Sequence, residues 1–204
     1  MAIVLNFNLL CKELIDLNAI LQSTAVANLD ASIEKISCID NWMWENQQEV
    51  QEVSLIQKKL LEGKIVIINL KSSIVKDLGI YVKKTAEKYV YDMWVNTEGY
   101  SELDADEINL KNKKYFERFY QIFDDLVKNQ NIKFQILGIG LETKFEYRET
   151  IIETIKKSDN VITWIVNKNL GKKLVLDNYV KRKETGMDFW IFERWDFSPD
   201  FVGW

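Results

Sequence analysis

The sequence predicts an α+β (mixed α/β) protein with a largely antiparallel sheet, and two observations lead to this class. Segments with the period of amphipathic helices alternate with apolar runs of strand length. In addition, the tetrapeptide Tyr-Val-Lys-Lys at residues 81–84 returns as Tyr-Val-Lys-Arg at residues 179–182, an offset of 98 positions. At that offset both halves follow the order helix, strand, helix and three strands, as two copies of one unit would. We therefore expect a first unit over residues 1–100 and a second over residues 101–204, as two domains or as one fused domain.

The first unit is predicted to contain two helices and four strands. Leucines at i, i+4, i+7 and i+11 form one apolar stripe and predict a helix over residues 8–22. Asn46 and Glu49 form a capping-box pattern that should begin a second helix, and Gly63 is a natural end for it. The strands are expected at residues 33–40, 64–70, 78–84 and 88–95.

The second unit repeats this order. A stripe of aromatic and aliphatic side chains over residues 115–127 predicts a helix with a buried face. The next strand, at residues 132–137, is followed by Gly138 and Gly140, which we expect in a turn. Thr143 and Glu146 form another capping-box pattern, which should begin the second helix. The remaining strands are expected at residues 161–167, 174–182 and 187–193.

The charge balance argues against nucleic acid as a partner. The chain carries 27 Lys and Arg against 31 Asp and Glu, which gives a net charge of −4 and a pI near 5.1. Nucleic-acid binding requires a surplus of basic side chains that displace counterions from phosphates. An acidic surface suits a basic protein partner instead.

The same composition favours a cytoplasmic protein. No apolar run approaches the length of a membrane-spanning helix, and the first residues lack the basic region of a secretory signal. Cys11 and Cys38 make neither a disulfide framework nor a zinc pattern, which is typical of a reducing compartment. We expect both to be small hydrophobic residues of the core.

The absence of histidine closes several classes of enzyme. Ser-His-Asp and Cys-His catalysis and His-ligated metal sites all require this side chain, and the chain has none. Acid–base chemistry would fall to Asp, Glu, Lys, Tyr or Cys. The sequence therefore favours a non-catalytic protein, and we assign it no catalytic residue, no metal and no cofactor.

An acidic connector joins the two units. Residues 97–107 hold five carboxylates and no basic side chain. Three interpretations are open: a solvated loop, a docking surface for a basic partner with Tyr100 as its aromatic anchor, or a calcium site at Asp104, Asp106 and Glu107. The candidate docking residues are Glu98, Tyr100, Glu102, Asp104, Asp106 and Glu107.

The segment Gln-Ile-Leu-Gly-Ile-Gly at residues 135–140 resembles the Q/R-x-x-G-x-G/A acetyl-CoA loop of the GNAT acetyltransferases. The matching positions are Gln135, Gly138 and Gly140, and the match covers these six residues only. The resemblance implies that backbone N–H groups of this turn would bind pyrophosphate between a strand and a helix.

The C-terminal tail is rich in aromatic residues. Trp195 and Trp204 lie beyond the last predicted strand, together with Phe197 and Phe201. They either fold back onto the core or form an exposed patch for a partner or for a homodimer.

Two functions follow from these patterns. The first is a soluble binding protein without catalytic activity, in its concrete form a bacterial immunity protein that neutralises a basic toxin by stoichiometric binding. The alternative is an acyl-CoA- or nucleotide-binding enzyme, similar to an acetyltransferase, that uses the turn from Gly138 to Gly140.

Overall fold

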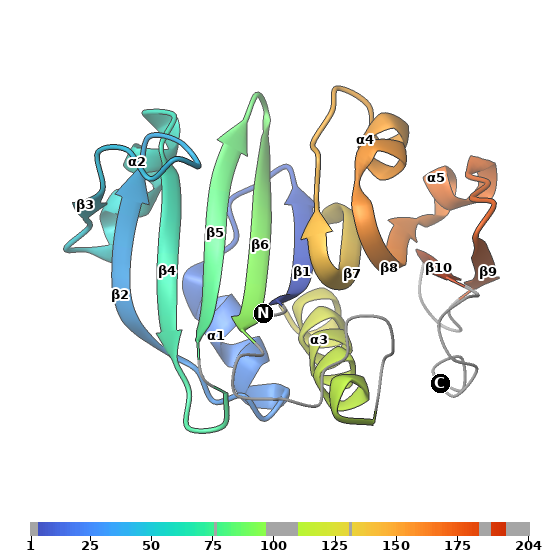
Figure 1. Ribbon diagram of the computed structural model, residues 1–204, viewed down its shortest axis with the longest axis horizontal. Coiled ribbons are helices and arrows are strands. Elements are labelled where there is room, and N and C mark those ends of the chain that lie inside the picture. The colour runs from blue at the N-terminus through green and yellow to red at the C-terminus, as the bar shows by residue number, and fades with distance from the viewer. Residues whose placement is uncertain (1–3, 76, 97–109, 131, 184–188, 195–204) are drawn as a thin grey trace.

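The computed structural model confirms the α+β class. It describes residues 4–75, 77–96, 110–130, 132–183 and 189–194. Within these ranges the chain forms ten strands, five α-helices and one 3₁₀ helix. All ten strands belong to one sheet, and every pair of neighbouring strands is antiparallel (Figure 1).

The elements have the following bounds along the chain. The strands are β1 (Val4–Cys11), β2 (Ser32–Ile39), β3 (Gln48–Glu49), β4 (Ile65–Lys71), β5 (Leu78–Thr85), β6 (Lys88–Asn96), β7 (Phe134–Lys144), β8 (Asp159–Asn167), β9 (Tyr179–Lys183) and β10 (Phe189–Arg194). The helices are α1 (Leu17–Val26), η1 (Val53–Leu55), α2 (Ile56–Leu61), α3 (Leu110–Lys128), α4 (Ile151–Lys157) and α5 (Lys168–Lys173).

The first strand joins the two halves of the chain. The order of strands in the sheet is β3-β2-β4-β5-β6-β1-β7-β8-β10-β9. Strand β1 pairs with β6 on one side and with β7 on the other, so residues of both predicted units share a continuous sheet. Figure 1 shows β1 in this place between the two groups of strands.

The two halves share an order along the chain but differ in their order across the sheet. The 98-residue offset relates β5 to β9 and β6 to β10. In the first half β5 lies between β4 and β6, whereas in the second half β10 lies between β8 and β9. Tyr81 therefore lies in an internal strand, and Tyr179 begins an edge strand.

The two larger of three hydrophobic cores lie on opposite faces of the sheet, and the small third one consists of Ile39, Ile65 and Ile67 with Tyr81 packed against them. The largest one packs against α1, α2 and α3, and Phe7 of β1 contacts Phe119 of α3 with ring centroids 5.6 Å apart. The second lies beneath α4 and α5 around Trp164. Because successive side chains of a strand point to opposite faces, Leu9 and Leu10 enter different cores.

Several predicted elements are confirmed. The stripe of α3 is buried at Phe116, Phe119, Ile122, Phe123 and Leu126. Strands β4, β5 and β6 occupy the predicted ranges to within one residue, and both cysteines are buried and free.

The end of α2 is also as predicted. Gly63 has φ +81°, and its N–H donates to the carbonyl of Leu60 at 3.1 Å. The N–H of Lys64 donates to the carbonyl of Lys59, also at 3.1 Å. These two bonds form a Schellman motif, in which glycine takes the left-handed conformation without a steric penalty.

The helix predicted over residues 8–22 is wrong in its first half. Strand β1 continues to Cys11, and α1 begins only at Leu17, after Asp16 has capped it by accepting from the N–H of Asn18 at 3.0 Å. The leucine stripe arises because a strand that is buried on both faces is followed directly by a helix. Both elements then supply apolar residues at helix-like intervals.

Both capping boxes were misplaced. Asn46 and Glu49 lie in a loop and in β3, while Thr143 lies in β7. The capping box of α4 is formed by Thr150 and Glu153, whose side chains accept from each other's backbone N–H at 3.2 and 3.4 Å. A Thr-x-x-Glu pattern occurs both at residues 143–146 and at residues 150–153, so the pattern alone does not identify the helix start.

The strand predicted over residues 174–182 begins too early. Helix α5 ends at Lys173, and β9 begins at Tyr179. The last strand, β10, matches its predicted range from Phe189 onward.

Candidate functional site

The sequence-predicted docking residues lie outside the part of the chain that the structure describes. They remain predictions: Glu98, Tyr100, Glu102, Asp104, Asp106, Glu107, Trp195 and Trp204.

The predicted turn at Gly138 and Gly140 is wrong, because both glycines lie inside β7. Gly138 pairs with Asn8 of β1 on one side and with Trp164 of β8 on the other. A Cβ atom at Gly138 would lie 3.0 Å from Cζ3 of Trp164, and one at Gly140 would meet the backbone of Asn160. The glycines thus allow close packing inside the sheet, and the backbone of an internal strand does not form a loop around pyrophosphate.

An exposed apolar cluster is present near the edge of the sheet formed by β3 and β2. Residues 40–47 connect β2 to β3, and we call them the tryptophan loop. Three consecutive side chains at its tip face solvent: Trp42 is 54% exposed, Met43 81% and Trp44 49%. Large apolar side chains that cluster on a surface mark sites of interaction more often than single ones do.

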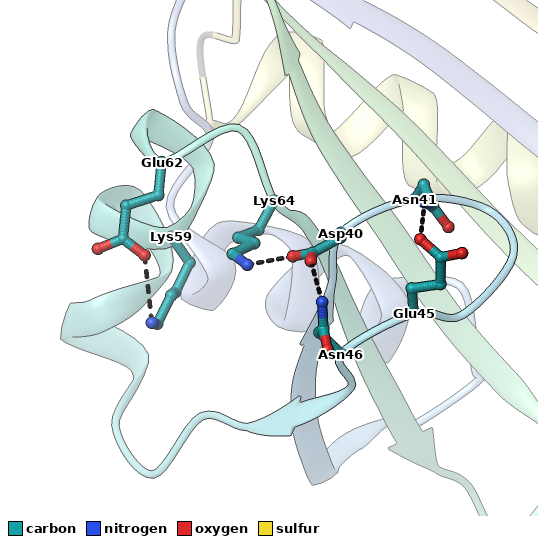
Figure 2. A network of polar contacts seen from close by, with 7 residues as sticks. All are labelled: Asp40, Asn41, Glu45, Asn46, Lys59, Glu62 and Lys64. Carbon is teal, nitrogen blue, oxygen red and sulfur yellow. Dashed lines mark hydrogen bonds and ion pairs between the residues drawn. The ribbon is translucent and has the colours of Figure 1, made fainter.

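Polar contacts hold the base of the tryptophan loop (Figure 2). The carboxylate of Asp40 accepts a charged hydrogen bond from Lys64 and a second one from Nδ2 of Asn46, at 2.6 Å. The backbone N–H of Asp40 donates to the carbonyl of Glu45 at 3.0 Å. Lys64 follows the glycine that ends α2, so the helix end places the cation that holds the loop.

Further hydrogen bonds shape the tip. Oδ1 of Asn41 accepts from the N–H of Met43 at 2.9 Å, and Nδ2 of Asn41 donates to Oε2 of Glu45 at 2.7 Å. Trp44 and Asn46 adopt φ values of +61° and +52°. Such left-handed conformations cost a non-glycine residue about 1 kcal/mol, so the surrounding hydrogen bonds must hold them in place.

One indole of the tryptophan loop also rests on the sheet. Trp42 contacts Tyr81 of β5 edge to face, with centroids 5.4 Å apart. Tyr81 in turn stacks on Trp94 of β6 at 5.9 Å. Trp94 fills the space above Gly79, where a Cβ atom would lie only 2.6 Å from its ring. A column of aromatic rings therefore connects the loop to the middle of the sheet.

The loop and the residues that follow it in the chain are acidic. Residues 40–57 include Asp40, Glu45, Glu49 and Glu52 and no Lys or Arg. Hydrogen bonds from Lys64 and then Asn46 lower the pKa of Asp40, so this carboxylate stays ionised and is compensated. The other three carboxylates belong to exposed residues.

A small cavity lies on the other face of this region, beneath η1 and the start of α1. Its volume is about 190 Å³, and its walls are mainly apolar. Three of the polar groups that line it already have partners: Asp16 caps α1, the hydroxyl of Tyr91 accepts from the N–H of Ile15 at 2.7 Å, and the hydroxyl of Ser54 donates to Glu52 at 3.0 Å. The cavity offers no converging set of free polar groups that would orient a ligand.

A strip of polar side chains crosses the sheet at β1, between Trp94 of β6 and Trp164 of β8. Nδ2 of Asn6 donates to Oδ1 of Asp92 at 2.8 Å, and Nδ2 of Asn8 donates to Thr143 at 2.6 Å. Burial raises the pKa of Asp92 to about 7, although the bond from Asn6 acts in the opposite direction. In the described ranges, no three His, Cys, Asp or Glu side chains gather as metal ligands would.

No helix in the ranges that the structure describes is both long enough and apolar enough to span a bilayer.

Comparisons with known proteins leave the function open. No family model and no curated protein matches the chain. Among solved structures, the T6SS protein PA0821 of Pseudomonas aeruginosa is similar at 9% sequence identity with a TM-score of 0.38. The match covers 94% of this chain and 65% of that one, so the chain spans less than two thirds of its length. A likeness at this level carries no argument about function.

Sequence reasoning missed the tryptophan loop. The predicted strand ended at residue 40 and the predicted helix began at Asn46, so the run Trp42-Met43-Trp44 between them received no role. A usable signal was present, because two of the seven tryptophans stand two positions apart in a stretch of carboxylates without basic residues.

Proposed function

We propose that this protein is a non-catalytic binding protein that neutralises a basic toxin by stoichiometric association, as an immunity protein does. The observation that carries the proposal is the tryptophan loop, which presents Trp42, Met43 and Trp44 to solvent in an acidic setting.

The chemistry of the tip is that of a protein-binding hot spot. Tryptophan is among the residues that contribute most to binding free energy when they are buried at an interface, and methionine adapts to irregular partner surfaces. The hydrogen bonds of Asn41 and the contact of Trp42 with Tyr81 order the loop before any partner arrives. Such order lowers the entropic cost of association.

The charge of the same region indicates what kind of partner fits. Exposed carboxylates at Glu45, Glu49 and Glu52 follow the apolar tip in the chain. They attract a basic surface, which raises the association rate, and they repel an acidic one. A second copy of this chain would bring the same carboxylates against each other, so the loop favours a different, basic protein over a homodimer.

Co-expression with a toxin tests the proposal. The probe is a basic toxin domain, to be sought among the genes that flank the gene of this chain and produced in a bacterial host. The wild-type chain should keep the host alive and form a one-to-one complex in titration calorimetry. The triple variant W42A/M43A/W44A should lose protection while its melting temperature changes little, because the three side chains are exposed.

A matched control is Val175→Ala, which removes an apolar side chain that is 80% exposed on a different part of the surface. This variant should protect as well as the wild type. Host death in the presence of the wild-type chain, or full protection by the triple variant, would contradict the proposal.

The acidic connector supplies a second proposed contact. Reversal of charge at Glu102, Asp104 and Asp106 should weaken the complex through loss of electrostatic attraction and leave the melting temperature nearly unchanged. If the affinity is unaltered, the connector is not part of the interface.

A further inference from the structure

The tryptophan loop combines two kinds of group at one place. The indoles of Trp42 and Trp44 are about half exposed, and Glu45 follows Trp44 directly in the chain. Neither Glu45 nor Glu49 forms an ion pair with any residue that the structure describes. Glu45, one position after Trp44, and Glu49, four positions further along the chain, thus have no cationic partner among the described side chains.

Arginine and lysine differ in how they meet such a surface. The guanidinium group is planar and weakly hydrated, so it stacks on an indole while it donates two parallel hydrogen bonds to a carboxylate. The ammonium group of lysine is a compact and strongly hydrated charge, which can lie over an indole, as Lys181 lies over Trp190, but has no planar face that stacks on the ring. A cation over an exposed tryptophan contributes about 0.5–1 kcal/mol.

In the second half of the chain, Trp190 already forms a cation–π contact within the protein. Nζ of Lys181 lies 4.5 Å from the ring centroid of Trp190, so the cation–π contact there is satisfied within the chain. In the described part of the molecule no such cation lies over Trp42 or Trp44, and the nearby Lys64 is engaged by Asp40. The indoles of the loop are therefore available to a cation from outside.

We infer that the tryptophan loop selects arginine over lysine in its partner, with guanidinium groups stacked on Trp42 and Trp44 and paired with Glu45 and Glu49. This inference rests on the proposed function, and it names the side chains of the basic protein that the loop contacts. A surface rich in lysine alone would be attracted to the loop but held less tightly.

Two labelled peptides of equal length and charge, an oligoarginine and an oligolysine, provide the test. Fluorescence anisotropy at physiological salt measures their affinity for the wild-type chain. Two stacked guanidinium groups should make the oligoarginine bind about threefold more tightly, because lysine gains only part of the contact with each ring. The variant Trp42→Ala/Trp44→Ala should bind both peptides equally and weakly, and Trp42→Phe/Trp44→Phe should restore part of the preference.

Glu45→Gln/Glu49→Gln should weaken both peptides, because both rely on the carboxylates, and Val175→Ala should change neither. Melting temperatures of all variants establish that they are folded. Equal binding of the two peptides to the wild-type chain, no binding of either, or a preference that persists without the indoles would overturn the inference. If the chain protects its host but does not distinguish the peptides, the proposed function stands and only the preference for arginine is wrong.

Discussion

Trp94 and Trp164 are packed in the same way but end in different surroundings. Each fills the space above a glycine of a neighbouring strand, Gly79 for Trp94 and Gly138 for Trp164. Trp164 is only 1% exposed, because α4 and α5 cover its part of the sheet and Phe145 packs on it at 5.9 Å.

Around Trp94, among the elements that the structure describes, the contacts run outward instead, through Tyr81 to Trp42 at the surface. The same packing device thus stabilises a closed core at one end of the sheet and supports an exposed binding loop at the other. Whether a helix covers the ring decides which of the two results.

The largest expected effect is a loss of stability when the buried ring of Trp164 is removed. Trp164→Ala should lower the free energy of unfolding by about 3–5 kcal/mol, because it removes a fully buried ring and leaves a cavity. Trp42→Ala, at the exposed end, should cost less than about 1 kcal/mol. Urea denaturation of both variants measures the difference, and equal losses would break the comparison.

A smaller effect is expected where the aromatic column begins. Gly79→Ala places a Cβ atom 2.6 Å from the ring of Trp94, so the ring must move, at a cost of about 1–3 kcal/mol. Because Trp94 supports Tyr81 and, through it, Trp42, the variant should also weaken binding of oligoarginine.

The control is Gly138→Ala, whose Cβ atom would lie 3.0 Å from the ring of Trp164, away from the tryptophan loop. This variant should also lose about 1–3 kcal/mol of stability, but its peptide binding should not change. Unchanged peptide binding in Gly79→Ala would show that the loop holds its position without Trp94.

The smallest effect concerns the polar strip between the two sites. The pKa of Asp92 in the folded protein, about 7, lies above the ordinary aspartate value of 3.8, so the folded state retains a proton that the unfolded state releases. The stability that this proton contributes is complete at acid pH and is lost as pH rises through about 7. The free energy of unfolding should therefore fall by about 1–2 kcal/mol between about pH 6 and pH 8.

Asp92→Asn should remove most of this pH dependence, since an amide has no proton to lose in that range. The matched control is Asp124→Asn, which changes a carboxylate that pairs with Lys128 on the surface of α3 at 2.7 Å. Denaturation at a series of pH values checks the prediction, and an unchanged slope in Asp92→Asn would assign the pH dependence to another group.

Local patterns predicted much of the fold but little of the site. Strands β4 to β6 and helix α3 were predicted because each follows a regular period and ends at a clear signal, such as Gly63. The segment from residue 8 to residue 22 failed because two adjacent elements together imitate one helix. The turn predicted at Gly138 and Gly140 was wrong because glycine is equally suited to a turn and to a tightly packed strand. Only the neighbouring side chains distinguish the two cases.

The sequence by itself determined the α+β class, the acidic charge, the absence of histidine chemistry and the buried state of both cysteines. These properties depend on composition and on periods within a single segment. Only the tertiary structure decided that β1 joins the two halves and that Trp42, Met43 and Trp44 face solvent. The physical reason is that exposure depends on what packs over a side chain, and α4 and α5 lie over Trp164, at the other end of the sheet.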